Sequence, residues 1–300
     1  MCTIMEARFK SLSIYEFQQQ FPNEDSCYAY LADLKWKAGF KCSKCGHNRS
    51  CQGIKVHDKQ CTRCCHLESP TSGTLFHKVK FSIHKAFWMV YFVSTNKKGI
   101  SSTELSRKLE LRQKTCWLFK MKIMKAMASS DRHPLEGKVE VDEFVIGQKE
   151  SGVVGRKNNS KRLVAIAIEK KGKGVSRVYA RQIDQASKKN LKAFLTEKTA
   201  VDAEIKSDCW SAYLALSMEM PNLKTEKAQR NGSNFTLIHR VIMGMKAWLR
   251  GTHGHAKHLQ FYLDEYCYRF NRHLMKEGIF SNLISRMAKH DPCPYKLIIA

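Results

Sequence analysis

Acidic residues are scarce in this sequence. Its 300 residues hold 27 Asp and Glu against 52 Lys and Arg, which leaves a formal net charge of +25 at pH 7. Such a surplus favours a polyanionic partner, and nucleic acid is the leading candidate. The alternative is that this chain is merely a basic protein without such a partner. The remaining composition is ordinary: 43% apolar and 26% charged residues argue against global disorder.

Long apolar runs are also absent. The most apolar stretch, residues 81–93, contains His84 and Lys85 and falls short of the ~20 residues that cross a bilayer. The opening MCTIMEARFK has no basic segment followed by an apolar core, so we expect no secretory signal and a cytosolic or nuclear chain. Thiols stay reduced there, and the 12 cysteines are therefore interpreted first as metal ligands or buried apolar residues.

Four cysteines have the spacing of a zinc site. Cys42 and Cys45 form one CxxC pair, Cys61 and Cys64 form a second, and 15 residues separate the pairs. Each CxxC turn offers two thiolates, and two such turns one hairpin apart supply the four tetrahedral ligands of structural Zn²⁺. The neighbouring Cys65 and His66 are alternative ligands. Basic residues around the quartet suit phosphate contacts, although such ribbons also serve as protein contacts.

The chain is too long for one hydrophobic core, and its periodicity changes twice. We expect an N-terminal helix (11–38) and zinc ribbon in residues 1–77, a helical region in 78–133, and a catalytic domain with C-terminal helices in 134–300. In the second region, Ser101 to Glu104 has the pattern of a capping box at a helix start. A second helix follows a break at 111–113, which suggests a helix-turn-helix.

After Gly137 the pattern becomes that of strands. Residues 138–146, 163–168 and 175–180 are strand candidates, with a turn at 152–159 between the first two. A helix at 187–197, a short strand into Ser207 and a helix from Cys209 follow, and the remainder is helical over 234–249, 257–272 and 279–289. Strands with interleaved helices predict an α/β fold whose mixed sheet is flanked by helices.

Two aspartates stand out in this basic half. Asp142 lies mid-strand between apolar neighbours, where a carboxylate is costly unless it is paired or binds a cation. Asp208 lies where a strand gives way to a helix. On adjacent strands, two such carboxylates supply oxygen ligands for divalent cations. A salt bridge for Asp142 and a helix N-cap for Asp208 are the alternatives.

One late helix adds two further candidates. His239 and Lys246 are seven residues apart and share a helix edge, about 10 Å apart along the axis. A neutral imidazole ligates metals and an ammonium holds phosphate. From spacing alone, a histidine at the core edge and a solvated lysine explain the pair better than a functional site does.

From about residue 22 to 296 the sequence resembles bacterial insertion-sequence transposases of the zinc-ribbon type. After the quartet, the segments that carry the resemblance are SGTLFH (72–77), KGISS (98–102), VDE (141–143), SDCWSAY (207–213), HRVI (239–242), KAWLRGTH (246–253), KHLQFYLDEY (257–266) and RFNR (269–272). The resemblance implies an RNase H-like catalytic domain of the DDE superfamily.

The resemblance also implies the site. Asp142 and Asp208 match the family's two aspartates, His239 matches a histidine variant of the third residue, and Lys246 matches a late lysine. The three metal-binding side chains would hold Mg²⁺ or Mn²⁺ for DNA cleavage and strand transfer. Gly244 departs from the pattern, since relatives often have a polar residue there, and the segment 253–258 is shorter than usual.

The implied partners are double-stranded DNA, namely the terminal repeats of a mobile element and its target, and at least a second copy of the chain on DNA. The expected location is cytoplasmic and nucleoid-associated, with no membrane contact. Two other classes remain open from the sequence: a DNA-binding regulator with an inactive core, and a zinc-ribbon interaction protein.

Overall fold

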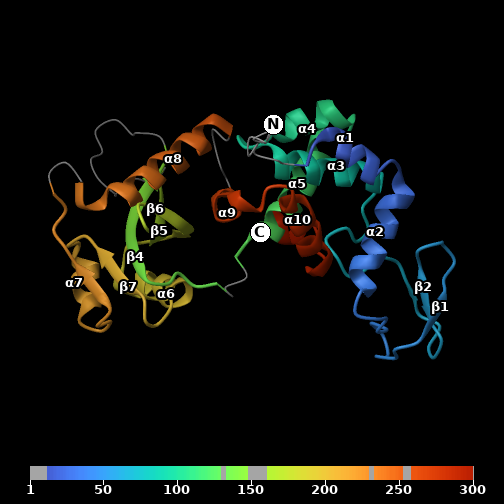
Figure 1. Cartoon of the computed structure of the whole chain (residues 1–300), viewed down its shortest axis with the longest axis horizontal. Helices are drawn as coiled ribbons and strands as arrows, with labels where there is room; N and C mark the ends of the chain where they lie inside the picture. Colours follow the sequence, from blue (N-terminus) through green and yellow to red (C-terminus); the bar gives the residue numbers. More distant parts are fainter. Residues whose placement is uncertain (1–11, 130–132, 148–160, 230–232, 253–257, 300) are drawn as a thin grey trace, which may run out of the picture. The chain divides into compact units, whose positions relative to one another are not determined.

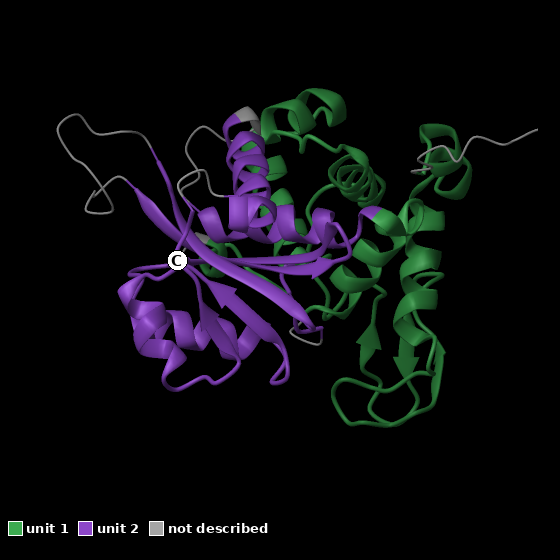
Figure 2. Cartoon of the chain, turned by 60° about the vertical axis from the view of Figure 1, so that its left-hand side comes forward, with its two compact units in different colours: residues 1–127, 274–300 green, residues 128–273 purple. Residues whose placement is uncertain are grey.

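A computed structural model describes residues 12–129, 133–147, 161–229, 233–252 and 258–299. The turn expected at 152–159 lies outside these residues, as does most of the segment 253–258. The chain divides into two compact units: residues 1–127 with 274–300, and residues 128–273 (Figure 2). Within the described residues, no helix is both long and apolar enough to span a membrane.

The first unit is mainly helical. Its helices are α1 (Ile14–Gln20), α2 (Glu24–Trp36), α3 (Ile83–Thr95), α4 (Ser102–Leu109), α5 (Gln113–Met127), α10 (Gly278–Lys289) and α11 (Lys296–Ile299) (Figure 1). The single helix expected over 11–38 is wrong in detail, because the chain breaks between α1 and α2 at Pro22. Proline lacks the N–H that a continuous helix needs, and Asn23 caps the second helix instead.

The capping box expected at α4 is half present. The Ser101 side chain accepts a hydrogen bond from the Glu104 N–H at 3.0 Å. The Glu104 carboxylate, however, is engaged by Arg107 and Lys108 one turn further on. The carboxylate thus pairs with basic side chains three and four residues later on the same helix face.

Residues 274–300 pack with the N-terminal helices rather than with the sheet. Phe280 of α10 lies 5.5 Å from Phe17, 5.6 Å from Phe21 and 6.3 Å from Phe87, measured between ring centroids. The four rings are all buried. The sequence prediction grouped these C-terminal helices with the catalytic domain, since an amphipathic pattern shows that a helix has a buried face but not what covers it.

The first unit also contains a small antiparallel sheet in the order β1-β2-β3, formed by β1 (Ser50–Gln52), β2 (Lys59–Cys61) and β3 (Leu67–Glu68). It joins the two CxxC turns, as the ribbon prediction requires.

The second unit is built on a five-stranded sheet. Its strands are β4 (Lys138–Ile146), β5 (Arg162–Lys171), β6 (Gly174–Ile183), β7 (Glu204–Ser207) and β8 (Leu223–Thr225), in the order β6-β5-β4-β7-β8. The strands β4, β5 and β6 run antiparallel, whereas β7 pairs parallel to β4, and β8 pairs parallel to β7. The sheet is therefore mixed, as the α/β prediction expects. The strand β8 was not predicted, because its three residues are too few to show a periodicity.

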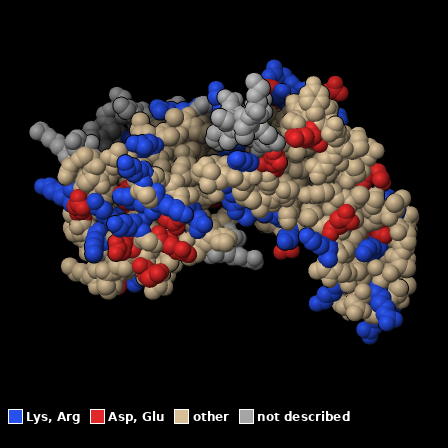
Figure 3. Space-filling model, viewed as in Figure 1, with Lys and Arg blue, Asp and Glu red and all other residues tan. Residues whose placement is uncertain are grey.

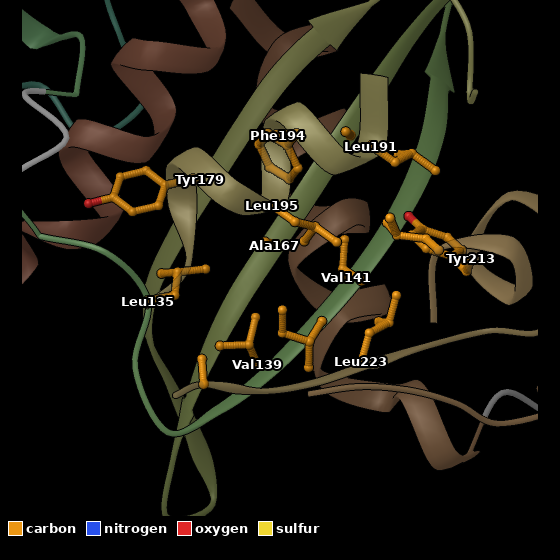
Figure 4. Close-up of a cluster of buried hydrophobic side chains, with 14 of the residues drawn as sticks. Leu135, Val139, Val141, Ala167, Tyr179, Leu191, Phe194, Leu195, Tyr213 and Leu223 are labelled. Carbon is orange, nitrogen blue, oxygen red and sulfur yellow. The ribbon is translucent and has the colours of Figure 1, made fainter. Parts of the chain in front are cut away.

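Helices cover both faces of this sheet. On one face, α6 (Lys188–Lys198) and α7 (Ser211–Ser217) pack on Val139, Val141 and Ile205 (Figure 4). On the other face lie η1 (Ser233–Phe235), α8 (Thr236–Thr252) and α9 (Leu259–Asn271), with the short turn η2 (His273–Met275) after them. Side chains alternate between faces along a strand, so even-numbered residues of β4 face α8 and odd-numbered ones face α7.

Candidate active site and zinc centre

The four predicted zinc ligands lie together. The Sγ atoms of Cys42, Cys45, Cys61 and Cys64 are all within 4.8 Å of one another, and among the described residues no other His, Cys, Asp and Glu side chains form such a group. The Cys42–Cys64 and Cys45–Cys61 sulfurs are each 3.6 Å apart. Four sulfurs ~2.3 Å from a tetrahedral Zn²⁺ would be separated by about 3.8 Å, so the quartet fits zinc.

The two halves of the site are built alike. The N–H of Gly46 donates to the Cys42 carbonyl at 2.9 Å, and the N–H of Cys65 donates to the Cys61 carbonyl at 3.0 Å. Gly46 and Cys65 both have positive φ, +72° and +55°, which closes each turn tightly. Cys65 therefore occupies a turn position and is exposed, and the group of four ligands contains neither Cys65 nor His66.

The thiols of the quartet influence one another. Burial raises the pKa of the Cys61 thiol, but backbone N–H groups of Cys64 and Arg63 and the thiols of Cys45 and Cys64 outweigh burial and lower it to about 7. The same thiol contacts raise the pKa of Cys64, so Cys61 loses its proton first, and thiolates are the species that bind zinc.

A buried carboxylate holds the first CxxC turn against α2. Glu68 is 3% exposed, and its Oε1 accepts a hydrogen bond from the Ser43 N–H at 2.6 Å. Its other oxygen lies 3.3 Å from the Lys35 ammonium. Burial raises the pKa of Glu68, but the Ser43 N–H and Lys35 more than compensate and hold the pKa below its ordinary value of 4.5.

The sheet brings the two predicted aspartates to neighbouring positions. In the parallel register of β4 and β7, Val139 pairs with Ile205 and Glu140 with Lys206. Two residues further along, Asp142 is level with Asp208, which follows the last residue of β7. Adjacent strands lie about 4.8 Å apart. Asp142 shares a face with Phe144, toward α8.

Helix α8 supplies the other two predicted residues over this face. The Nε2 of His239 lies 3.7 Å from the Oδ2 of Asp142. Two ligands about 2.1 Å from one ion, at angles of 90° to 120°, are separated by about 3.0 to 3.6 Å, so this pair lies close to the spacing of two ligands on one cation. Asp142, Asp208 and His239 do not, however, all lie within 4.8 Å of one another.

Lys246 lies two helical turns after His239 on α8. Its ammonium is 5.2 Å from the centroid of the Phe144 ring, a cation–π distance. Burial lowers the pKa of Lys246, the negative charge of Asp142 raises it and Arg250 lowers it, with a net lowering from 10.5. The ammonium is therefore half-buried and within electrostatic reach of Asp142.

The structure bears on the two alternative interpretations of the aspartates, namely a salt bridge for Asp142 and a helix N-cap for Asp208. The side chain of Asp142 lies 3.7 Å from that of His239, the candidate third ligand. Asp208 is not the N-cap of α7. Trp210 holds that position, and its N–H donates to the Asp208 Oδ1 at 3.1 Å. This turn fixes one oxygen of Asp208 and leaves the second available for a cation.

Two buried polar residues behind the site were not predicted. Glu143 and Tyr213 lie on the opposite face of β4, and Tyr213 is fully buried at the start of α7 (Figure 4). Burial raises the pKa of Tyr213 well above 10, and Glu143, Asp142 and Asp208 raise it further. All three carboxyl groups are therefore close to one hydroxyl. The polar Glu143 in an apolar strand was the available signal.

Gly244 has a packing role. A Cβ at this position of α8 would meet the Tyr266 hydroxyl of α9 at 3.2 Å, which is a tight contact. The polar residue that relatives often have here would press on Tyr266 unless that ring moved. Glycine thus allows α8 and α9 to approach closely over the sheet.

Two family models match the chain. The ISXO2-like transposase domain matches residues 134–271, and the transposase zinc-ribbon domain matches residues 22–67. The first covers both aspartates, His239 and Lys246, and the second covers the cysteine quartet. No curated protein matches the sequence.

Solved structures of Mos1 transposase resemble the chain distantly. A pre-cleavage Mos1 transpososome is 11% identical with a TM-score of 0.29, and covers 68% of this chain and 78% of its own. The Mos1 strand transfer complex is 12% identical with a TM-score of 0.30, at 69% and 78% coverage. A paired-end complex with the left transposon end has a TM-score of 0.22 at 11% identity, covering 68% and 79%. Scores below 0.5 do not establish a common fold.

Proposed function

We propose that this chain, whose residues 134–271 match the ISXO2-like transposase domain and whose residues 22–67 match the transposase zinc-ribbon domain, binds the ends of an insertion sequence and catalyses metal-dependent cleavage and strand transfer. The observation that carries this proposal is the side-by-side position of Asp142 and Asp208 with His239 3.7 Å from Asp142. The reaction would take place in the cytoplasm, at the nucleoid.

Asp142, Asp208 and His239 would hold Mg²⁺ or Mn²⁺. Divalent ions at such a site activate the attacking oxygen and stabilise the leaving oxygen of an in-line displacement at phosphorus. The chain's own residues supply the frame: β4 and β7 fix the aspartates, and the Trp210 N–H orients the Asp208 carboxylate. Lys246 would bind a phosphate oxygen of the DNA strand beside Asp142.

A histidine in the third position sets the expected metal preference. Imidazole replaces a charged oxygen ligand by a neutral nitrogen, and nitrogen suits Mn²⁺ better than Mg²⁺. We therefore expect Mn²⁺ to support more activity than Mg²⁺. Equal activity with the two ions would argue against His239 as a ligand.

We propose that the first unit recognises the DNA. Lys and Arg side chains are exposed on both units and at the end of the ribbon (Figure 3). The helices α4 and α5 are joined by a three-residue turn in which Glu110 has a φ of +53°, and α5 begins with exposed polar and basic residues. We propose that this pair is a helix-turn-helix that presents the start of α5 to the DNA, with phosphate contacts supplying salt-sensitive affinity.

Binding two DNA ends at once would require at least a dimer on DNA, and this oligomeric state is part of the proposal. It is tested by the mass of the complex with a terminal-repeat duplex, measured by light scattering. A complex with one chain and one duplex would contradict it.

The direct test of the function compares the wild type with Asp142→Asn on a duplex that carries the element's terminal repeat. The wild type should nick the duplex with Mn²⁺, and Asp142→Asn should be at least about 100-fold slower because one carboxylate ligand is lost. Mn²⁺ binding, followed by electron paramagnetic resonance, should weaken in the same variant. The matched control is Asp202→Asn, an exposed aspartate at the opposite end of β7.

DNA binding by Asp142→Asn should equal that of the wild type, because the variant leaves the first unit intact. If the wild type binds the duplex but cuts it with neither metal, the protein is a regulator with an inactive core. If Asp142→Asn cuts as fast as the wild type, the aspartate site is not the active site.

A further inference from the structure

A pocket lies beside the acidic site but on the other face of the sheet. It encloses about 510 Å³ where β4 and β6 end and β5 begins, and its lining includes Val145, Leu163 and Ile183 from these strands. Pockets of about 300–1,000 Å³ are typical for small organic ligands. In open α/β sheets such ligands bind at the carboxyl ends of parallel strands, and β4, β6 and β7 all run toward this end.

The pocket is joined to the acidic site through one turn. Trp210 lines the pocket with a side chain that is 41% exposed, and its backbone N–H donates to the Asp208 carboxylate at 3.1 Å. A ligand that contacts the Trp210 ring would therefore touch a residue only two positions along the chain from Asp208, a proposed metal ligand. None of the predicted catalytic side chains lines this pocket.

The polar lining has the chemistry of a nucleotide site. Lys161 and Arg162 supply two positive charges at the start of β5 against the one negative charge of Asp184, and Lys161 forms no ion pair within the described residues. Gln182 and Gln185 offer amide donors and acceptors, which match the edge of a base. An exposed indole is a stacking surface for any base.

We propose that this pocket binds one unstacked nucleotide of the DNA strand, with its base on the Trp210 ring and its phosphate beside Lys161 and Arg162. The proposal rests on the transposase function, since it needs a single-stranded or distorted DNA end at the acidic site. Unstacking a base near the reacting phosphate would fix the strand while Asp142 and Asp208 act on it.

The test uses a short single-stranded DNA with one 2-aminopurine base, whose fluorescence is quenched when it stacks. Wild type and Trp210→Phe, which keeps an aromatic ring, should both quench the probe. Trp210→Ala should lose the quenching and bind about tenfold more weakly. Lys161→Gln should weaken binding more than Lys224→Gln, which removes the same charge from an exposed position of β8. Circular dichroism of each variant checks that the fold is retained.

Equal quenching by Trp210→Ala and the wild type would overturn the proposal, as would equal effects of the two lysine variants. The same proteins are then assayed for nicking of a terminal-repeat duplex. If the wild type nicks and Trp210→Ala quenches normally, only the nucleotide pocket fails. If the wild type quenches through Trp210 but never nicks, the pocket stands and the transposase function fails.

Discussion

The two candidate metal centres differ in how complete they are. In the ribbon, four cysteine sulfurs lie within 4.8 Å of one another. In the sheet domain, Asp142 and His239 are 3.7 Å apart, but the three candidate ligands do not form such a close group. Two of the four cysteines are buried and two are half-buried, whereas the side chain of His239 is 47% exposed.

This difference matches the two roles that metals have in proteins. A structural zinc site is closed by four protein ligands, whereas a catalytic site keeps positions open for water and substrate. The difference also reflects how far apart the ligands of each site lie along the sequence. The quartet lies within residues 42–64, and one hairpin assembles it, whereas the acidic site needs β4, β7 and α8 to meet. The predictions below test whether the two centres behave so differently.

The largest expected effect is on the zinc site, which four cysteine ligands close. Cys61→Ser removes a thiolate, and structural zinc contributes on the order of 10–16 kcal/mol of apparent binding free energy in small zinc domains. We expect zinc content, measured by atomic absorption, to fall from one per chain to nearly none, with loss of the ribbon's folded signals in nuclear magnetic resonance spectra. Cys65→Ser, the exposed neighbour, should keep the metal. Loss of zinc from Cys65→Ser would show that the ligand set is different.

Lys246→Ala should impair catalysis at the aspartate site without unfolding the protein. We expect cleavage to slow by about 100-fold, because one charged group that holds the strand is lost. The thermal midpoint should hardly change, since Lys246 is only half-buried. Its lowered pKa means that the ammonium loses its proton at a lower pH than an ordinary lysine, so wild-type activity should decline early on the alkaline side. An unchanged rate for Lys246→Ala would remove the lysine from the site.

Glu68→Gln tests the support of the zinc site. The carboxylate accepts from the Ser43 N–H and pairs with Lys35, so the neutral amide should destabilise the first unit by about 2 kcal/mol. Because the folded-state pKa is depressed below 4.5, the wild-type stabilisation is present above that value and is lost as pH falls through the depressed pKa. Urea titrations at several pH values measure both effects. Equal pH dependence of the two proteins below pH 4.5 would contradict the assignment.

The smallest expected effect is a change of metal preference. His239→Asp restores an oxygen ligand and a negative charge, which should raise activity with Mg²⁺ relative to Mn²⁺ by about tenfold. The ratio of the nicking rates with the two ions is the measurement, with His273→Asp at the exposed turn η2 as the control. A ratio that stays the same in His239→Asp would mean that this side chain does not contact the metal.

The sequence alone determined the local features of the protein. CxxC spacing is read within one hairpin, so the zinc ligands followed from residues 42–64. Alternation and helical periodicity placed β4, β5 and β6 and most helices, because these patterns depend on neighbours along the chain. Even so, Pro22 divides a helix that was expected to be continuous. The Glu104 carboxylate, which was expected to cap its helix, pairs with Arg107 and Lys108 instead.

Only the tertiary structure decided what lies beside what. The parallel register of β4 and β7 sets Asp142 level with Asp208, and the packing of α8 on the sheet brings His239 to Asp142. The contact of Phe280 with Phe17 assigned the C-terminal helix to the first unit, and the strand ends of the sheet formed a pocket together with Trp210. Such contacts join residues far apart along the chain, and their partners are selected by packing, which no local pattern records.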